Sequence, residues 1–195
     1  MKIMVDLDRV VFECPSFLFW LGHKIYKTFD KNSELKFNEV NSEKAMQYPD
    51  ALSFFKLFND KSFVEIPGAA STLQKWNNKG FDIHFISSRP NLKPFQKATV
   101  KWLKSHNISY SKLVFGCSNK AEYCKQNNFD VMIDDTFENC ENCCFLGIPS
   151  IWLVNKHNQN DQNIHVVKMH VANDWQDIDS AVQSINMMKK LNPTM

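Results

Sequence analysis

The sequence predicts an α/β fold in which helices cover both faces of a parallel sheet. Short apolar runs alternate with amphipathic stretches, the alternation begins directly after Met1, and it resumes after Pro67-Gly68. Repeated strand–helix units of this kind form parallel sheets, which bind ligands at the carboxyl ends of their strands. Functional residues are therefore expected where the predicted strands end.

The individual elements follow from hydrophobic spacing and from local breakers such as Gly80. The expected strands are KIMVDLD (2–8), FDIHFISS (81–88), LVFG (113–116), DVMIDD (130–135) and SIWLVN (150–155). The expected helices are AASTLQKWNNKG (69–80), KPFQKATVKWLKSHN (93–107), KAEYCKQNN (120–128) and ENCENCCFLG (138–147). The polar stretch NKHNQNDQN (155–163) is expected to be an exposed loop, followed by a short strand and a helix that begins near Asp174.

Between the first strand and Pro67 the alternation stops for about fifty residues, which show helical spacing and no clear strand. Two segments, SFLFWLGHKIYKTF (16–29) and DALSFFKLFND (50–60), carry apolar residues at the intervals of helices that pack on each other. We therefore expect a core of residues 1–14 and 67–195 and a small helical cap of residues 15–66, inserted after the first strand.

Composition narrows the class of protein. A chain of 195 residues with a net charge of +2 suits one compact domain with a small insertion. It lacks the clustered Lys/Arg stripe that nucleic-acid polymers require. No apolar stretch is long enough to cross a bilayer, so we expect a cytoplasmic protein without membrane contact. Both a monomer and a homodimer remain open.

Six cysteines raise the question of disulfides or zinc. A chain of this size without a secretion signal does not need disulfides, so we expect free thiols. Cys140, Cys143 and Cys144 form a C-x-x-C-C cluster, but a structural zinc site usually needs a second pair of ligands. The role of this cluster stays open.

Two acidic pairs end two of the predicted strands. Asp6 and Asp8 share one face of an extended strand, and neighbouring carboxylates repel unless a cation compensates them. Asp134 and Asp135 follow a later strand, and oxygen-rich sites suit Mg²⁺. The alternatives are a strand end exposed to solvent for the first pair and a helix N-cap for the second.

Ser87-Ser88 and Lys120 also follow predicted strands. Hydroxyls donate to phosphoryl oxygens, and an ammonium neutralises charge on an attacking carboxylate. Taken singly, a serine after a strand is usually a turn residue and a lone lysine is usually solvated. Order and spacing, rather than either residue alone, favour a phosphate site.

Taken together, these residues form a pattern. Its segments are D-L-D-R-V-V (6–11), E-I-P-G-A (65–69), F-I-S-S-R-P (85–90), Lys120 and I-D-D-T (133–136). The pattern resembles the four motifs of the haloacid dehalogenase (HAD) superfamily and, more narrowly, the 5'(3')-deoxyribonucleotidase family and its bacterial relatives. The resemblance covers nearly the whole chain and is weakest in the expected cap. It implies a Rossmann-like, HAD-type three-layer core.

The resemblance also implies roles. Asp6 would be the nucleophile that forms an aspartyl-phosphate and a ligand of Mg²⁺, and Asp8 would be the acid/base, with its main-chain carbonyl on the metal. Ser87 would hold the phosphoryl group and Lys120 would balance charge. Asp135 would be the third protein ligand, with Asp134 beside it.

Other candidate residues concern the substrate. Arg9 stands where the family often has a small residue, and Arg89 matches bacterial relatives better than animal ones. Both, with Ser88, are candidate substrate contacts. Phe17 and Trp20 in the expected cap are candidates for stacking on a nucleobase, although aromatics at helical spacing more often form a core.

The resemblance favours a nucleoside monophosphate as substrate. The alternatives are another small phosphate ester, or a phosphate-binding or interaction module without turnover.

Overall fold

The computed structural model describes residues 1–14, 60–89, 91, 93–159 and 169–191. Six strands form one parallel sheet in the order β5-β4-β1-β6-β7-β8. The strands are β1 (Lys2–Val5), β4 (Asp82–Ile86), β5 (Lys112–Val114), β6 (Val131–Asp134), β7 (Ser150–Leu153) and β8 (Met169–Ala172). The helices are α4 (Ala69–Asn78), α5 (Lys93–Ser105), α6 (Lys120–Gln126), α7 (Phe137–Phe145) and α8 (Trp175–Leu191).

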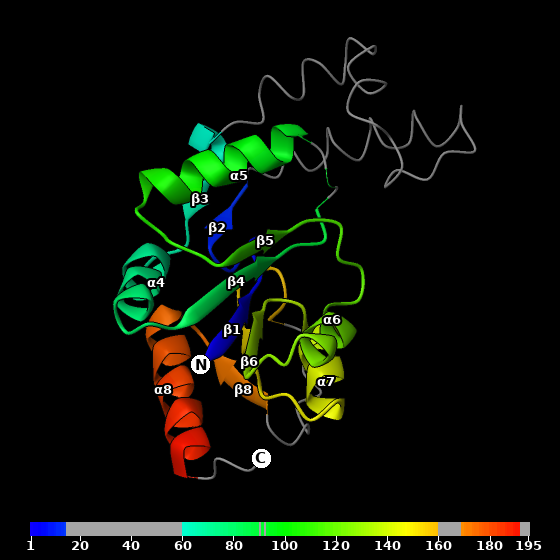
Figure 1. Cartoon of the computed structure of the whole chain (residues 1–195). Coiled ribbons are helices and arrows are strands. Elements are labelled where there is room, and N and C mark those ends of the chain that lie inside the picture. The colour runs from blue at the N-terminus through cyan, green and yellow to red at the C-terminus, as the bar shows by residue number, and fades with distance from the viewer. Residues whose placement is uncertain (15–59, 90, 92, 160–168, 192–195) are drawn as a thin grey trace, which may run out of the picture.

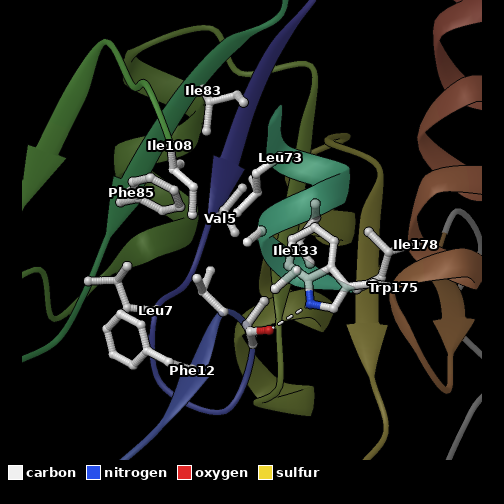
Figure 2. Packing of buried hydrophobic residues seen from close by; sticks show 14 of the residues in the cluster. Val5, Leu7, Phe12, Leu73, Ile83, Phe85, Ile108, Ile133, Trp175 and Ile178 are labelled. Atoms are coloured by element: carbon white, nitrogen blue, oxygen red, sulfur yellow. Dashed lines mark hydrogen bonds between the residues drawn. The ribbon is translucent and has the colours of Figure 1, made fainter. Parts of the chain in front are cut away.

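Helices cover both faces of the sheet, as Figure 1 shows. Successive side chains of a strand point to opposite faces, so β1 sends Ile3 and Val5 to one side and Met4 to the other. The first side packs against α5 and, as Figure 2 shows, against α4 and α8. The second side packs against α6 and α7. The predicted α/β class with a three-layer parallel-sheet core is confirmed.

A short pair of strands follows β1. β2 (Phe12–Glu13) pairs antiparallel with β3 (Val64–Glu65), and a 3₁₀ turn (Asp60–Ser62) precedes β3. The rings of Phe12 and Phe63 stack with centroids 4.4 Å apart. The expectation of no strand before Pro67 is therefore wrong at these residues, because strands of two residues are too short to show an alternating pattern.

The C-terminal helix α8 holds the segment that follows β1 in the sequence. The indole nitrogen of Trp175 donates to the carbonyl oxygen of Val10 at 2.8 Å, drawn as the dashed line in Figure 2. The Asp174 carboxylate accepts from the backbone N–H groups of Gln176 and Asp177 and so caps α8, as its predicted start near Asp174 requires.

Several expectations lie outside the described residues. They concern residues 15–59 of the predicted cap (15–66), which include the first cap segment, nearly all of the second, and the aromatic candidates Phe17 and Trp20. Among the helices that are described, none is long and apolar enough to cross a membrane.

The core allows a direct test of stability. Leu73 of α4 is 0% exposed, so Leu73→Ala should lower the free energy of unfolding by about 2–5 kcal/mol through lost burial and a residual cavity. Leu191→Ala is the matched control, because this leucine is 74% exposed and its truncation should change stability by no more than about 0.5 kcal/mol. Urea denaturation of the two variants measures both values, and equal losses would contradict the packing of α4 on the sheet.

Candidate active site

The two acidic pairs meet at the carboxyl ends of β1 and β6. These strands are neighbours, with Val5 opposite Ile133, and the backbone N–H of Asp6 donates to the carbonyl oxygen of Ile133 at 2.9 Å. Continuing this register by one residue places Asp6 opposite Asp134. By the alternation of side chains, both acids face the side of the sheet that α6 and α7 cover.

Lys120 joins these two acids. Its Nζ donates to Asp6 Oδ1 at 2.6 Å and to Asp134 Oδ2 at 2.7 Å, and the lysine is only 5% exposed. Lys120 is the first residue of α6, and the Asn119 side chain caps this helix by accepting from the N–H of Glu122 at 3.0 Å. The helix start therefore fixes where the ammonium lies, and the alternative of a solvated lysine is wrong.

Burial shapes the ionisation of the cluster. It raises the pKa of Asp6, reinforced by the charges of Asp134 and Asp8 and opposed by Lys120. Burial also raises the pKa of Asp135, against the charge of Arg9. For Lys120, burial disfavours the charged form, but the carboxylates of Asp6 and Asp134 outweigh it and raise the pKa. A further cation at this place would favour the ionised carboxylates.

The two neighbouring acids of β6 have different surroundings. Asp134 Oδ1 accepts from the backbone N–H of Thr136 at 2.9 Å, and Oδ2 accepts from Lys120 and from Asn139 Nδ2 at 2.7 and 3.2 Å. Within the described part of the chain, both polar contacts of the Asp135 carboxylate involve Oδ2. Asp134 is thus already engaged on both oxygens, whereas Asp135 has more capacity for a new ligand.

The donor set fits a hard divalent cation. Asp6, Asp134 and Asp135 are buried, and each offers a carboxylate oxygen within 4.8 Å of the others. Oxygen donors of this kind suit Mg²⁺, which binds one or two carboxylates and keeps several waters. Because Asp134 is occupied by Lys120 and Thr136, the residues best placed to hold the ion are Asp6 and Asp135.

Asp8 is held by a residue from the neighbouring strand end. Arg89 Nε and Nη2 donate to the two carboxylate oxygens of Asp8 at 2.6 and 2.5 Å, a two-pronged contact. The guanidinium carbon lies 5.1 Å from the ring centroid of Phe12 and 4.9 Å from that of Phe63. Arg89 is thus buried and engaged with a neighbouring acid, and its expected contact with substrate stays a prediction.

Arg9 lies at the edge of the cluster. Its Nε is 3.1 Å from Asp135 Oδ2, and its side chain is 41% exposed. Its φ of 59° lies in the left-handed region, which costs a residue with a Cβ about 1 kcal/mol. Glycine, which the family often has at this place, lacks a Cβ and would avoid that cost, so this chain adds a cation here at the expense of backbone strain.

The serines occupy two different environments. Ser87 is buried at the end of β4, and its Oγ accepts from the backbone N–H of Arg89 at 3.1 Å. Its main chain is fixed from both sides, because Ser87 N donates to Val114 O and Ser87 O accepts from Cys117 N. Ser88 is exposed. The structure therefore brings Ser87 to the strand ends beside β1 and leaves Ser88 at the surface.

A set of contacts behind Asp135 was missed by the sequence analysis. Asn158 belongs to the stretch expected to be an exposed loop, yet it is only 7% exposed and its Nδ2 donates to the carbonyl oxygen of Asp135 at 2.6 Å. Trp152 Nε1 donates to the same oxygen at 3.0 Å. A polar stretch gives no sequence signal for one buried amide, so the exposed-loop prediction is wrong at this residue.

The cysteines play a structural part. All six lie in the described part of the chain and carry reduced thiols, as predicted. Cys140 Sγ lies 3.7 Å from the carbonyl oxygen of Asp134 and 3.6 Å from that of Ile151, and Cys144 Sγ lies 2.9 Å from Ser150 Oγ. The cluster therefore packs α7 against β6 and β7.

Comparisons with solved structures agree with this fold. A predicted phosphatase from Clostridium acetobutylicum superposes with a TM-score of 0.61 at 15% identity, covering 94% of this chain and 98% of that one. A β-phosphoglucomutase from Clostridium difficile gives 0.57 at 14% identity, covering 95% and 98%. YfnB from Bacillus subtilis, a HAD hydrolase solved with magnesium bound, gives 0.58 at 10% identity, covering 93% and 98%. At such identities the likeness shows the fold alone.

A search of curated proteins found none with significant sequence similarity to this chain. Comparison with models of protein families is more specific than the comparison of structures. The family model described as 5' nucleotidase, deoxy (pyrimidine), cytosolic type C protein matches residues 1–190, nearly the whole chain. The chain therefore belongs to the cytosolic type C 5'-nucleotidase family and is a phosphoric monoester hydrolase of the HAD superfamily.

Proposed function

We propose that this phosphatase is a Mg²⁺-dependent 5'-nucleotidase that works through an aspartyl-phosphate on Asp6. The observation that carries the proposal is the buried ammonium of Lys120 between Asp6 and Asp134. A carboxylate oxygen of Asp135 lies within 4.8 Å of a carboxylate oxygen of each of these two acids. A carboxylate held beside a fixed cation, at the strand ends where ligands bind, is suited to attack an anionic phosphate ester.

Asp6 and Asp135 would hold Mg²⁺ through their side chains, and Asp8 through its main-chain carbonyl. The ion would neutralise charge on the carboxylates and on the phosphoryl oxygens, which is the main requirement of phosphoryl transfer. YfnB, which has a similar fold, was solved with magnesium bound, and this supports Mg²⁺ as the ion.

In the first step, a carboxylate oxygen of Asp6 attacks phosphorus and the ester bond to the leaving oxygen breaks. Asp8 gives that oxygen a proton, and Lys120 balances charge on Asp6 and on the transferring group. In this structure Arg89 holds both oxygens of Asp8, so proton transfer requires at least one of these contacts to open.

In the second step, water attacks phosphorus of the aspartyl-phosphate and Asp8 accepts its proton. The bond between phosphorus and the Asp6 oxygen breaks, which releases inorganic phosphate and regenerates the carboxylate. Ser87 would hold the phosphoryl group in both steps, and its buried place at the end of β4 supports this role. Covalent catalysis thus divides one difficult displacement into two easier ones.

Substrate choice is assigned to the inserted residues 15–66, including Phe17 and Trp20, and to the exposed cation Arg9 and Ser88. A cap that closes over such a site excludes water and contacts the part of the substrate that does not react. The family description supports a nucleoside monophosphate, in particular a deoxynucleotide, and a cytosolic location. The same chemistry would serve another small phosphate ester, so a substrate panel has to decide.

Phosphate release from nucleoside monophosphates and sugar phosphates, with Mg²⁺ or with EDTA, tests the proposal. The unaltered protein should release phosphate only with Mg²⁺ and fastest from a nucleotide. Asp6→Asn should lower turnover by at least about a thousandfold, because it removes the attacking carboxylate and preserves the size of the side chain.

Asp82→Asn, at the opposite end of β4, is the control and should retain activity. Turnover retained in Asp6→Asn, or undiminished by EDTA, would contradict the mechanism. Faster release from sugar phosphates than from any nucleotide would contradict the substrate class alone.

The division between the two β6 acids predicts two different phenotypes. Asp135→Asn should raise the Mg²⁺ concentration for half-maximal activity by at least about tenfold, because a direct ligand is lost. Asp134→Asn should change that concentration less and lower stability in EDTA more, because it removes a partner of buried Lys120. Activity titrations and thermal unfolding of both variants measure these effects, and the reverse ranking would exchange the two roles.

Lys120 should also be a large contributor to stability. Lys120→Ala leaves buried carboxylates without their counter-ion and should cost about 3–5 kcal/mol in the free energy of unfolding. Lys75→Ala is the matched control, because Lys75 pairs with Asp179 at the surface and its loss should cost no more than about 1 kcal/mol. If denaturation in EDTA gives the same value for both variants, the central role of the Lys120 ammonium is wrong.

A further inference from the structure

We propose that Asn158 is a positioning residue that sets the Mg²⁺ affinity of the site by holding the main chain of Asp135. Asn158 lies in the turn after β7, and its side chain bonds to the main chain of Asp135, Leu153 and Asn155, and not to the Asp6 carboxylate or Lys120. The inference rests on the proposed function, because it concerns the residue there assigned as a direct metal ligand.

The Asn158 amide is fully engaged. Nδ2 donates to the carbonyl oxygens of Asp135 and Leu153 at 2.6 and 2.9 Å, and Oδ1 accepts from the backbone N–H of Asn155 at 2.7 Å. Only the amide nitrogen can donate to two carbonyl oxygens, so these partners fix the orientation of the group. One buried side chain thus joins the end of β6, the end of β7 and the turn that follows.

Trp152 strengthens the hold on Asp135. β6 and β7 pair with Asp134 opposite Trp152, which places the indole beside the next residue, and Nε1 donates to Asp135 O at 3.0 Å. The carbonyl oxygen of Asp135 therefore accepts from two buried donors, one from β7 and one from the turn. With the carbonyl fixed in this way, the peptide plane that follows Asp135 has little freedom to rotate.

The same turn reaches the carboxylate. Asn155 Nδ2 lies 3.4 Å from Asp135 Oδ2, and Asn155 Oδ1 accepts from the N–H of His157 at 2.8 Å. His157 Nε2 and Lys156 Nζ lie 3.0 and 3.2 Å from Glu13 Oε1 of β2. The turn is thus held by contacts of its own, and removal of the Asn158 amide alone should leave most of it in place.

The consequence for a metal follows from the demands of Mg²⁺. This ion requires nearly octahedral geometry at short distances, so a small displacement of one carboxylate weakens binding. Groups that orient metal ligands typically change metal affinity by about 10–100-fold when they are removed. A residue that merely satisfied buried carbonyl groups would change stability and leave Mg²⁺ affinity unaltered.

The test is calorimetric titration of Mg²⁺ into the full chain without substrate, together with thermal unfolding in EDTA. Asn158→Ala should weaken Mg²⁺ binding by about 10–100-fold. Trp152→Phe, which removes only the second donor to Asp135 O, should weaken it in the same direction and decides the matter if Asn158→Ala does not fold. At saturating Mg²⁺, kcat of both variants should return close to the unaltered value.

Asn77→Ala is the matched control. Asn77, in the last turn of α4, makes a similar pair of hydrogen bonds away from the acidic cluster, with Nδ2 donating to Ser109 O at 2.9 Å and Oδ1 accepting from Ser109 N at 3.0 Å. Its loss should lower the unfolding temperature and leave Mg²⁺ affinity unchanged.

Two outcomes overturn the inference separately. If Asn158→Ala and Trp152→Phe bind Mg²⁺ within about twofold of the unaltered protein, the amide is only structural. If the unaltered protein itself binds no Mg²⁺, the proposed function fails and the inference with it.

Discussion

The ammonium of Lys120 between Asp6 and Asp134 is the interaction on which the site depends. Carboxylates taken out of water beside one another are unstable unless a cation lies among them. The adjacency of β1 and β6 brings the acids together, and the start of α6 delivers the ammonium. The strand order of the sheet and the first residue of one helix therefore fix the geometry in which phosphorus would be attacked.

The surrounding charges divide into pairs with separate tasks. Asp8 is held by Arg89, Asp134 by Lys120 and the backbone of Thr136, and Asp135 by Arg9 at the exposed edge. Four carboxylates thus face three cationic side chains, so a divalent ion would leave the cluster with one positive charge, which suits an anionic phosphate ester. The pairing leaves the Asp135 carboxylate more capacity for a new ligand than that of Asp134, which holds Lys120 in place.

The core could be predicted because its signals are local, and the acidic cluster could be predicted because its residues follow the ends of strands in a recognisable order of motifs. Apolar runs and the residues that end them identified β1, β4 and β6, and the motif order brought Asp6, Lys120 and Asp134-Asp135 together. Three features had no such signal. The two-residue strands β2 and β3 are too short for periodicity, the Arg89–Asp8 pair joins residues 81 apart, and Asn158 is buried within a polar stretch. These three features depend on contacts between residues that are distant in the sequence, so no local pattern predicts them.

A crystal structure with Mg²⁺ and beryllium fluoride, a stand-in for a phosphoryl group, would test the central claim most directly. The account predicts beryllium bonded to a carboxylate oxygen of Asp6, Mg²⁺ contacting Asp6 and Asp135, and Lys120 still in contact with Asp134. A beryllium fluoride group without a bond to Asp6, or a Mg²⁺ ion away from Asp135, would contradict it.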